Sequence, residues 1–251
     1  RLLAAIGGYW LLLAAIGGYL AAIGKRPAAI SGYSRQPTAS DTIKSFSGGH
    51  VFGHPTNRPA FHRMAATAHA VETRTFDFEP NMAPDFAALE LALKSVKPNL
   101  VFLATPNNPT GSVVDPDQMK ACMMRHPDVL FVLDEAYIEY ASVRSLADEV
   151  VDLGNAVCLS SLSKLGLAGL RLGFASAHPQ LIGVLDAARM PFPVNAMSQA
   201  VGAMLLREFG GELRERVVSC VAQRQRVNAG VQALMYDTSV EVVEGQGNFL
   251  A

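Results

Sequence analysis

Residues 160–171 read SSLSKLGLAGLR and place one lysine, Lys164, in a run of small, hydroxylated and apolar residues. A lysine among apolar neighbours loses solvation, which favours its neutral amine. A neutral amine can attack a carbonyl carbon and form a Schiff base. Ser161, Ser163 and Arg171 add donors that suit a phosphate. The stretch predicts a lysine that reacts with a phosphate-bearing aldehyde, although an aliphatic stem buried at a strand end would explain the same lysine.

A turn after a predicted strand supplies a second polar group. Residues 100–104 (LVFLA) form an unbroken apolar run and predict a buried strand. The residues that follow, 105–111 (TPNNPTG), predict a turn because they contain Asn-Pro and Thr-Gly. The turn would leave the amide of Asn108 at the strand end, able to donate a hydrogen bond, although an ordinary surface turn has the same composition.

A second apolar run, 129–133 (VLFVL), predicts another buried strand and leads into Asp134. An acid at the carboxyl end of a buried parallel strand lies where open α/β sheets bind ligands, although a helix cap would also explain it. A carboxylate there can pair with a protonated pyridine nitrogen, and Tyr137 can reach a phenolate oxygen. Together with Lys164, these groups match the needs of pyridoxal 5′-phosphate (PLP).

Three segments resemble the PLP-dependent aminotransferases of fold type I: PNNPTG at 106–111, VLDEAY at 132–137 and SLSKLGLAGLRLGF at 161–174. The likeness is greatest to the histidinol-phosphate aminotransferases, because a group of them shares the short spacing between Lys164 and Arg171. Residues 191–195 (PFPVN) and 247–250 (GNFL) also resemble that group. The resemblance runs from roughly residue 59 to residue 251.

The resemblance implies a role for each candidate site residue. Lys164 would hold PLP and act as the general base, a task that suits a neutral amine. Asp134 would keep the ring nitrogen protonated, and Asn108 and Tyr137 would donate to the ring oxygen. The phosphate would be bound by Ser161, Ser163 and Arg171. Phe61 falls near the position of an aromatic ring cover in relatives, although a core phenylalanine explains it as well.

The fold predicted from this pattern is α/β, with three α/β/α layers around a mostly parallel sheet and the start of a smaller carboxyl-terminal α/β domain. We expect a repetitive apolar segment of doubtful role at 1–30, the PLP-binding large domain at 31–195, and a long helix with the start of an incomplete small domain at 196–251. Predicted strands lie at 69–78, 100–104, 129–133, 157–160, 170–177 and 240–243. Predicted helices lie at 85–96, 115–125, 178–189 and 197–229, the last with an interruption at Gly210-Gly211.

The first thirty residues differ from the rest of the chain. The sequence LLAAIGGY at 2–9 recurs at 12–19, and no charged residue occurs from 2 to 24. Such a run is long enough to span a bilayer, and the basic residues after it could mark a cytoplasmic side. Five glycines lie within it, and only Arg1 precedes it, which argues against both an anchor and a secretory signal. We expect no function from this segment and predict no membrane association.

Charge and cysteine content argue against several kinds of partner. The formal net charge is −1 and the basic residues are scattered, so nothing favours nucleic-acid binding. Three distant cysteines predict neither a disulfide framework nor a zinc site, which fits a reducing compartment such as the cytoplasm. Gly and Pro residues break any helix that would align His50 with His54, and loop or core positions are expected for the histidines, so we predict no metal site. A solvated helix face is predicted for Arg214, Arg216, Arg224 and Arg226.

The resemblance implies transamination between histidinol phosphate and 2-oxoglutarate or glutamate, in histidine biosynthesis, by a homodimer. Two alternatives stay open. One is another PLP enzyme of this fold, either an aromatic amino-acid aminotransferase or a decarboxylase of phosphorylated amino acids. The other is a PLP-fold protein without catalysis. Relatives typically continue for roughly a hundred residues past the position of Ala251, a part that would carry the arginine that grips the substrate.

Overall fold

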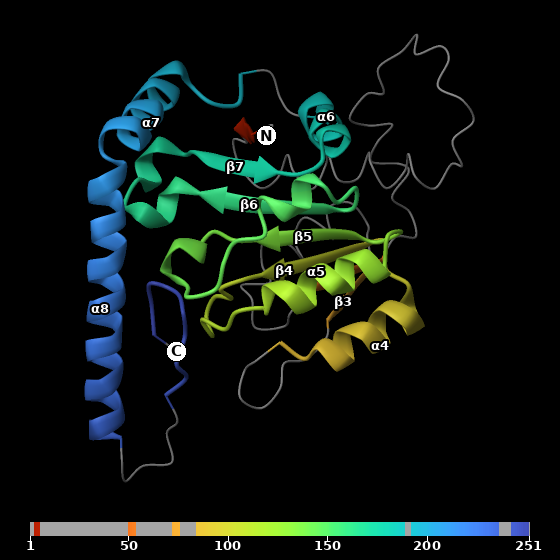
Figure 1. The fold of residues 1–251 in the computed structure, drawn as a ribbon, viewed down its shortest axis with the longest axis horizontal. Coiled ribbons are helices and arrows are strands. Elements are labelled where there is room, and N and C mark those ends of the chain that lie inside the picture. Colours follow the sequence, from red (N-terminus) through yellow and green to blue (C-terminus); the bar gives the residue numbers. More distant parts are fainter. Residues whose placement is uncertain are drawn as a thin grey trace.

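The computed structural model describes residues 3–5, 50–53, 72–75, 84–188, 192–235 and 242–250. Its described strands form a seven-stranded sheet in the order β1-β7-β6-β5-β4-β2-β3 (Figure 1). The strands are β1 (Leu3–Ala5), β2 (His50–Gly53), β3 (Glu72–Thr75), β4 (Leu100–Ala104), β5 (Leu130–Asp134), β6 (Ala156–Ser161) and β7 (Gly173–Ser176). The predicted strand starting near residue 170 begins three residues later than expected, because a short 3-10 turn, η4 (Ala168–Leu170), precedes it.

The sheet is parallel from β3 through β6, while β7 and β1 are antiparallel to their neighbours. Parallel strands are covered on both faces, which explains why β4 and β5 are unbroken apolar runs. The register pairs Ala104 with Asp134 and Asp134 with Leu159. The carboxyl ends of β4, β5 and β6 therefore lie side by side, and this edge of the sheet carries the candidate site.

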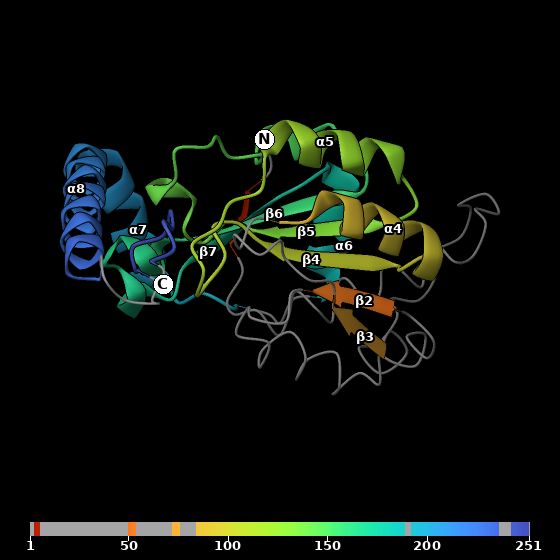
Figure 2. The same cartoon turned by 90° about the horizontal axis from the view of Figure 1, so that it is seen from below.

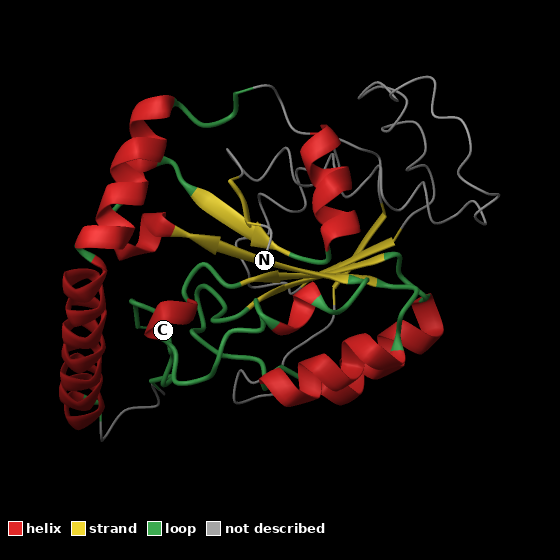
Figure 3. Cartoon of the chain, turned by 45° about the horizontal axis from the view of Figure 1, so that its top comes forward, coloured by secondary structure: helices red, strands yellow, loops and turns green. Residues whose placement is uncertain are grey.

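Helices cover both faces of the sheet and complete the three predicted layers. Figures 2 and 3 show α4 and α5 together on one face, and Figure 3 shows α6 on the other. The helices are α4 (Phe86–Val96), α5 (Pro116–Arg125), α6 (Pro179–Ala188), α7 (Ala196–Glu208) and α8 (Gly210–Leu234). Phe131 of the sheet and Met119 of α5 are fully buried, and both belong to one core cluster of the described residues.

Aspartates set the starts of α4 and α5, as the sequence predicts. The Asp85 side chain accepts a hydrogen bond from the backbone N–H of Ala88 at 2.8 Å. Asp115 accepts two, from the N–H groups of Asp117 and Gln118, each at 2.9 Å. Such caps satisfy backbone donors that the first helical turn cannot pair internally.

The long predicted helix at 197–229 is two helices, because the chain turns at Phe209 just before the predicted Gly210-Gly211 interruption. Helix α8 runs along one side of the molecule, and residues 242–250, which we call the return segment, come back beside it (Figure 1). Within the return segment, residues 242–245 have no regular secondary structure, so they do not form the predicted strand at 240–243, and residues 240–241 lie outside the described part.

The apolar repeat at the start of the chain contributes to the sheet. Leu3–Ala5 form β1, the edge strand that pairs with residues 174–176 of β7. Among the helices of the described residues, none combines the length and the apolar character needed to cross a bilayer. The predicted domain boundaries at 30 and 195 stay predictions.

Candidate functional site

Three of the predicted site residues meet at the carboxyl edge of the sheet. Asn108 comes from the turn after β4, Tyr137 from the loop after β5, and Lys164 from the 3-10 turn η3 (Leu162–Leu165) after β6. The Asn108 amide Nδ2 donates to the Tyr137 hydroxyl at 3.0 Å. The Lys164 Nζ lies 4.9 Å from the centroid of the Tyr137 ring. The Tyr137 side chain therefore contacts both an amide donor and an amine.

The turn that carries Asn108 is held rigidly from both sides. The neighbouring Asn107 is buried, and its amide donates to the Thr110 hydroxyl at 2.8 Å. Gly111 closes the turn, since its N–H donates to the Asn107 carbonyl at 2.7 Å. Gly111 has φ +69°, a left-handed conformation that glycine adopts without a steric penalty. Its carbonyl in turn accepts from the N–H of Gln246 in the return segment at 2.7 Å.

Two neighbouring acids at the end of β5 have different surroundings. Asp134 is half-buried, and its Oδ1 accepts from the Ala136 N–H at 3.1 Å. Glu135 is buried instead, where its carboxylate accepts from the Leu146 N–H at 2.9 Å and from the Ser145 hydroxyl. Burial raises the pKa of Glu135, and these hydrogen bonds oppose the rise. Glu135 therefore belongs to the core, a role that the sequence did not reveal, whereas Asp134 stays half-buried at the end of β5, and its role in the site stays a prediction.

The predicted phosphate donors lie at the adjoining end of β6 and β7. The Ser161 Oγ accepts from the Ser163 N–H at 3.1 Å and donates to the Leu172 carbonyl at 3.3 Å. Ser161 is paired in register with Gly173, two residues after Arg171. The Arg171 side chain is exposed, and its Nη1 donates to the Ala168 carbonyl at 3.4 Å. The structure therefore brings the two serines together, and a shared phosphate with Arg171 stays a prediction.

Contacts between the return segment, α8 and the site were not predicted from the sequence. The Phe249 ring packs edge-on against Tyr137, with ring centroids 5.1 Å apart and planes at 86°. The Tyr140 hydroxyl donates to the Lys164 carbonyl at 2.6 Å. Arg224, which we placed on a solvated helix face, is half-buried and donates to the carbonyls of Tyr140 and Gly247, so that prediction is wrong for this arginine. The motif GNFL was the only sequence signal that pointed to this region.

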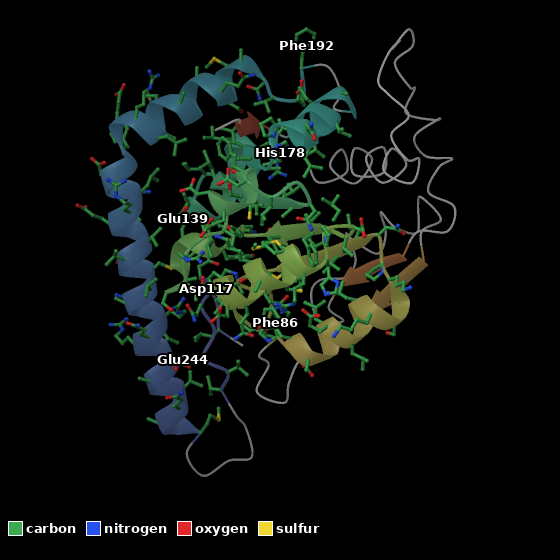
Figure 4. All side chains as sticks on the ribbon, turned by 45° about the vertical axis from the view of Figure 1, so that its right-hand side comes forward. Phe86, Asp117, Glu139, His178, Phe192 and Glu244 are labelled. Carbon is green, nitrogen blue, oxygen red and sulfur yellow. The ribbon has the colours of Figure 1, made fainter. Side chains whose placement is uncertain are left out.

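Figure 4 shows how close these elements lie: Glu139, from the loop after β5, lies between the sheet and α8, and Glu244 of the return segment lies beside the same helix. The predicted ring cover, Phe61, lies outside the described residues. The loop after β5 contacts two neighbouring elements through Tyr140: its hydroxyl donates to Lys164 in the turn after β6, and its carbonyl accepts from Arg224 of α8.

The donor set at this edge fits PLP. An amine can bind the aldehyde, a carboxylate at a strand end can face a ring nitrogen, and an amide and a phenol 3.0 Å apart can share a ring oxygen. The serine hydroxyls and an arginine near the end of β6 suit a phosphate. Apart from the exposed Arg171, these side chains are half-buried, and their chemistry fits PLP.

A separate group of possible metal ligands lies between α4 and α5. In the described part of the chain, ligand atoms of Glu90, Cys122 and His126 lie within 4.8 Å of one another. The Glu90 carboxylate is already paired with Arg125 at 2.5 Å and with His126 at 2.9 Å. Burial raises the pKa of Cys122 to about 12, so the thiol keeps its proton. We interpret this group as an ion-pair cluster that ties the two helices together.

Comparison with protein families and known sequences relates most of the chain to one family. The family model for aminotransferase class I and II matches residues 24–251. A histidinol-phosphate aminotransferase from Aliivibrio fischeri is 36% identical over 190 residues, which are 74% of this chain and 54% of the relative. An aromatic amino acid aminotransferase from Mycolicibacterium paratuberculosis is 40% identical over 165 residues, 64% of this chain and 45% of the relative. The chain thus spans about half the length of these relatives.

Solved structures confirm the fold. A histidinol-phosphate aminotransferase from Sinorhizobium meliloti, in complex with pyridoxal-5′-phosphate, has a TM-score of 0.77 at 23% identity and aligns with 99% of this chain and 60% of its own. A histidinol-phosphate aminotransferase from Clostridium acetobutylicum has a TM-score of 0.76 at 14% identity and aligns with 99% of this chain and 66% of its own. At such identities the likeness concerns the arrangement of the layers, which agrees with the α/β fold predicted from the sequence.

Proposed function

Since this chain belongs to the class I and II aminotransferase family, we propose that it binds PLP through Lys164 and transfers amino groups between an amino donor and a 2-oxo acid. The observation that carries this proposal is the cluster at the carboxyl edge of the sheet. There the Lys164 Nζ lies 4.9 Å from the Tyr137 ring, and the Tyr137 hydroxyl accepts a hydrogen bond from Asn108. These residues stand at the ends of three adjacent strands, where open α/β sheets bind ligands.

Each residue has a task that its chemistry supports. When bound, PLP supplies a ring that withdraws electrons from the substrate carbon. Lys164 would hold the aldehyde carbon through its Nζ, and as a free amine it would take up and return a proton. Asp134 would pair with the ring nitrogen and favour its protonated form. Asn108 and Tyr137 would orient the ring by hydrogen bonds to its oxygen.

The phosphate would be held at the end of β6. Ser161 and Ser163 are two residues apart there, joined by the hydrogen bond from the Ser163 N–H to the Ser161 Oγ, and Arg171 can add a charge-assisted hydrogen bond once its side chain leaves the Ala168 carbonyl. That 3.4 Å contact is at the weak end of the hydrogen-bond range, so little opposes the movement. A phosphate anchor at this position fixes the distance between the aldehyde and Lys164.

We assign histidinol phosphate as the first candidate donor, with 2-oxoglutarate and glutamate as the partner pair, a reaction of histidine biosynthesis. The motif GNFL and the relative from A. fischeri support it. An aromatic amino acid is the second candidate donor, since the relative from M. paratuberculosis is 40% identical. We also propose a homodimer in the cytoplasm, with the cofactor site in a large domain at 31–195 and a small domain beginning within 196–251.

The experiment that tests the proposal is spectroscopic. Purified chain mixed with PLP should develop an absorbance band near the visible edge, which borohydride bleaches and which Lys164→Ala lacks. Mass spectrometry of the reduced protein should place the cofactor on the peptide containing Lys164. A donor panel of L-histidinol phosphate, phenylalanine and tyrosine then separates the two candidate substrates. A Lys164→Ala variant that kept the band would refute the assignment of the lysine.

A further inference from the structure

Both ends of the Lys164 residue are contacted by one short stretch, Tyr137–Tyr140, in the loop after β5. At the side-chain end, the Nζ lies 4.9 Å from the Tyr137 ring centroid. At the backbone end, the Tyr140 hydroxyl donates to the Lys164 carbonyl at 2.6 Å. The 3-10 turn η1 (Ile138–Tyr140) sets the spacing between the two tyrosines. One loop therefore contacts both the backbone of Lys164 and its side-chain amine.

Tyr140 is suited to hold a backbone group in place. Its side chain is only 7% exposed, so a hydroxyl without a partner there would lose much of its hydration. Burial raises the pKa of Tyr140, and the hydroxyl keeps the proton that it donates. Hydrogen bonding from the Asn248 side chain, in the return segment, opposes this rise in the pKa of Tyr140. Tyr140 thus connects the turn that carries Lys164 with the return segment.

Arg224 of α8 contacts both the η1 turn and the return segment. Its Nη1 donates to the Tyr140 carbonyl at 3.3 Å and to the Gly247 carbonyl at 2.6 Å. One guanidinium thereby joins the η1 turn to the return segment, whose Phe249 packs on the Tyr137 ring. The Arg224 Nη1 carries two N–H donors, so this one nitrogen can satisfy both carbonyls.

We propose that Tyr140 and Arg224 are positioning residues for Lys164: Tyr140 fixes the backbone of the lysine, and Arg224 fixes Tyr140 and links it to the return segment. This proposal rests on the proposed function of Lys164 as the residue that binds PLP. It predicts that removal of either group shifts the amine away from the aldehyde while the phosphate and ring contacts stay in place. Both residues would act on the cofactor only through Lys164.

The test compares two forms of the cofactor. PLP carries an aldehyde and uses Lys164 covalently, whereas pyridoxamine phosphate carries an amine and binds without that bond. Tyr140→Phe, which removes only the hydroxyl, should weaken PLP binding about 3- to 10-fold, as expected for one lost hydrogen bond, and pyridoxamine phosphate less than about 2-fold. Arg224→Met should act in the same direction. Arg226→Met, at an exposed position two residues along the same helix, is the matched control and should change neither.

A second measurement works without cofactor. Hydrogen–deuterium exchange of the apo protein should be faster in Tyr140→Phe for peptides that cover 162–171, and in Arg224→Met for those and for 242–250. Peptides of β4 should exchange as in the unmodified chain, because the core is intact. The double variant should exchange little faster than Tyr140→Phe alone at 162–171, since Arg224 acts there through Tyr140.

The outcomes separate the two proposals. If the unmodified chain shows no lysine-dependent absorbance band but exchange at 162–171 responds to Tyr140→Phe, the proposed function fails and the anchoring of the Lys164 backbone stands. If the band forms and Tyr140→Phe weakens both cofactor forms equally, the positioning role is refuted, because general loosening explains the loss. Unchanged exchange at 162–171 would refute it as well.

Discussion

Replacing Gly111 by alanine tests whether the return segment is packed against the turn that carries Asn108. A Cβ at this position would overlap the Cα of Gly245 and lie 2.9 Å from the N of Gln246. Both neighbours are backbone atoms, which cannot move aside by a change of rotamer. Gly166 offers a matched control, because it also has a positive φ, +85°, but a Cβ there meets nothing within 4 Å.

The structure gives the magnitude of each effect. A left-handed conformation costs an L-residue about 1–2 kcal/mol, and Gly166→Ala should lose only this amount. Gly111→Ala should lose the same amount and should also displace the return segment. The hydrogen bond from Gln246 N–H to the Gly111 carbonyl at 2.7 Å would break, as would those from Ser142 to the Gln246 side chain at 2.7 and 2.8 Å. A typical hydrogen bond contributes about 0.5–1.5 kcal/mol, and the bonds of the exposed Ser142 contribute less. Together with the cost of the left-handed conformation, Gly111→Ala should lower the free energy of unfolding by about 2–5 kcal/mol.

The assay is urea unfolding of the two variants beside the unmodified chain, with limited proteolysis of the return segment. We expect Gly111→Ala to be less stable than Gly166→Ala by at least about 1 kcal/mol, the value of one lost hydrogen bond. The return segment should be cleaved faster only in Gly111→Ala. Equal stabilities of the two alanine variants, with equal cleavage, would show that the close approach of the two backbones does not exist in solution.

Three further predictions concern the ion-pair cluster, the core and the cofactor. Burial alone would raise the pKa of Glu90, but hydrogen bonds from His126 and Arg125 lower it from 4.5 to about 2. The ionised Glu90 carboxylate should therefore add to the free energy of unfolding above pH 4.5, and this contribution should disappear as the pH falls toward 2. In Glu90→Gln, the free energy of unfolding measured by acid titration should not show this decrease. Phe131→Ala should destabilise the protein by about 3–5 kcal/mol in urea unfolding, because its fully buried ring leaves a cavity. Ser161→Ala should weaken PLP binding by about 1–3 kcal/mol in a spectroscopic titration, and an inactive variant that retains PLP would contradict the role of this serine.

Local patterns were enough to predict the central layers. The apolar run at 100–104 became β4 with the same bounds, because a strand covered on both faces needs apolar side chains at every position. Asp85 and Asp115 marked the starts of α4 and α5 because aspartate side chains accept from the first backbone donors. These features depend on residues at most four positions apart, so a single sequence reveals them.

Contacts between distant residues were not predictable in the same way. Arg224 lies 84 positions from Tyr140, and Gln246 lies 104 positions from Ser142. An arginine among acids and polar residues on a helix has the pattern of a solvated face whether or not a carbonyl lies opposite. Only the packing of α8 beside the η1 turn decides that Arg224 is half-buried. The same holds for Tyr140, whose hydroxyl gains its partner from the turn after β6.

Two kinds of contact position the candidate site: the pairing of the strands, and the contacts that hold the turns after them. The ends of β4, β5 and β6 place Asn108, Tyr137 and Lys164 near one another through the register of the sheet alone. Register fixes the strands but leaves the turns after them free to shift, and the reacting amine is on such a turn. The contacts of the return segment with Gly111 and with the η1 turn remove that freedom at two of the three turns. The third, which carries Lys164, is held through Tyr140, so precision at the amine depends on residues that the motif around the lysine does not contain.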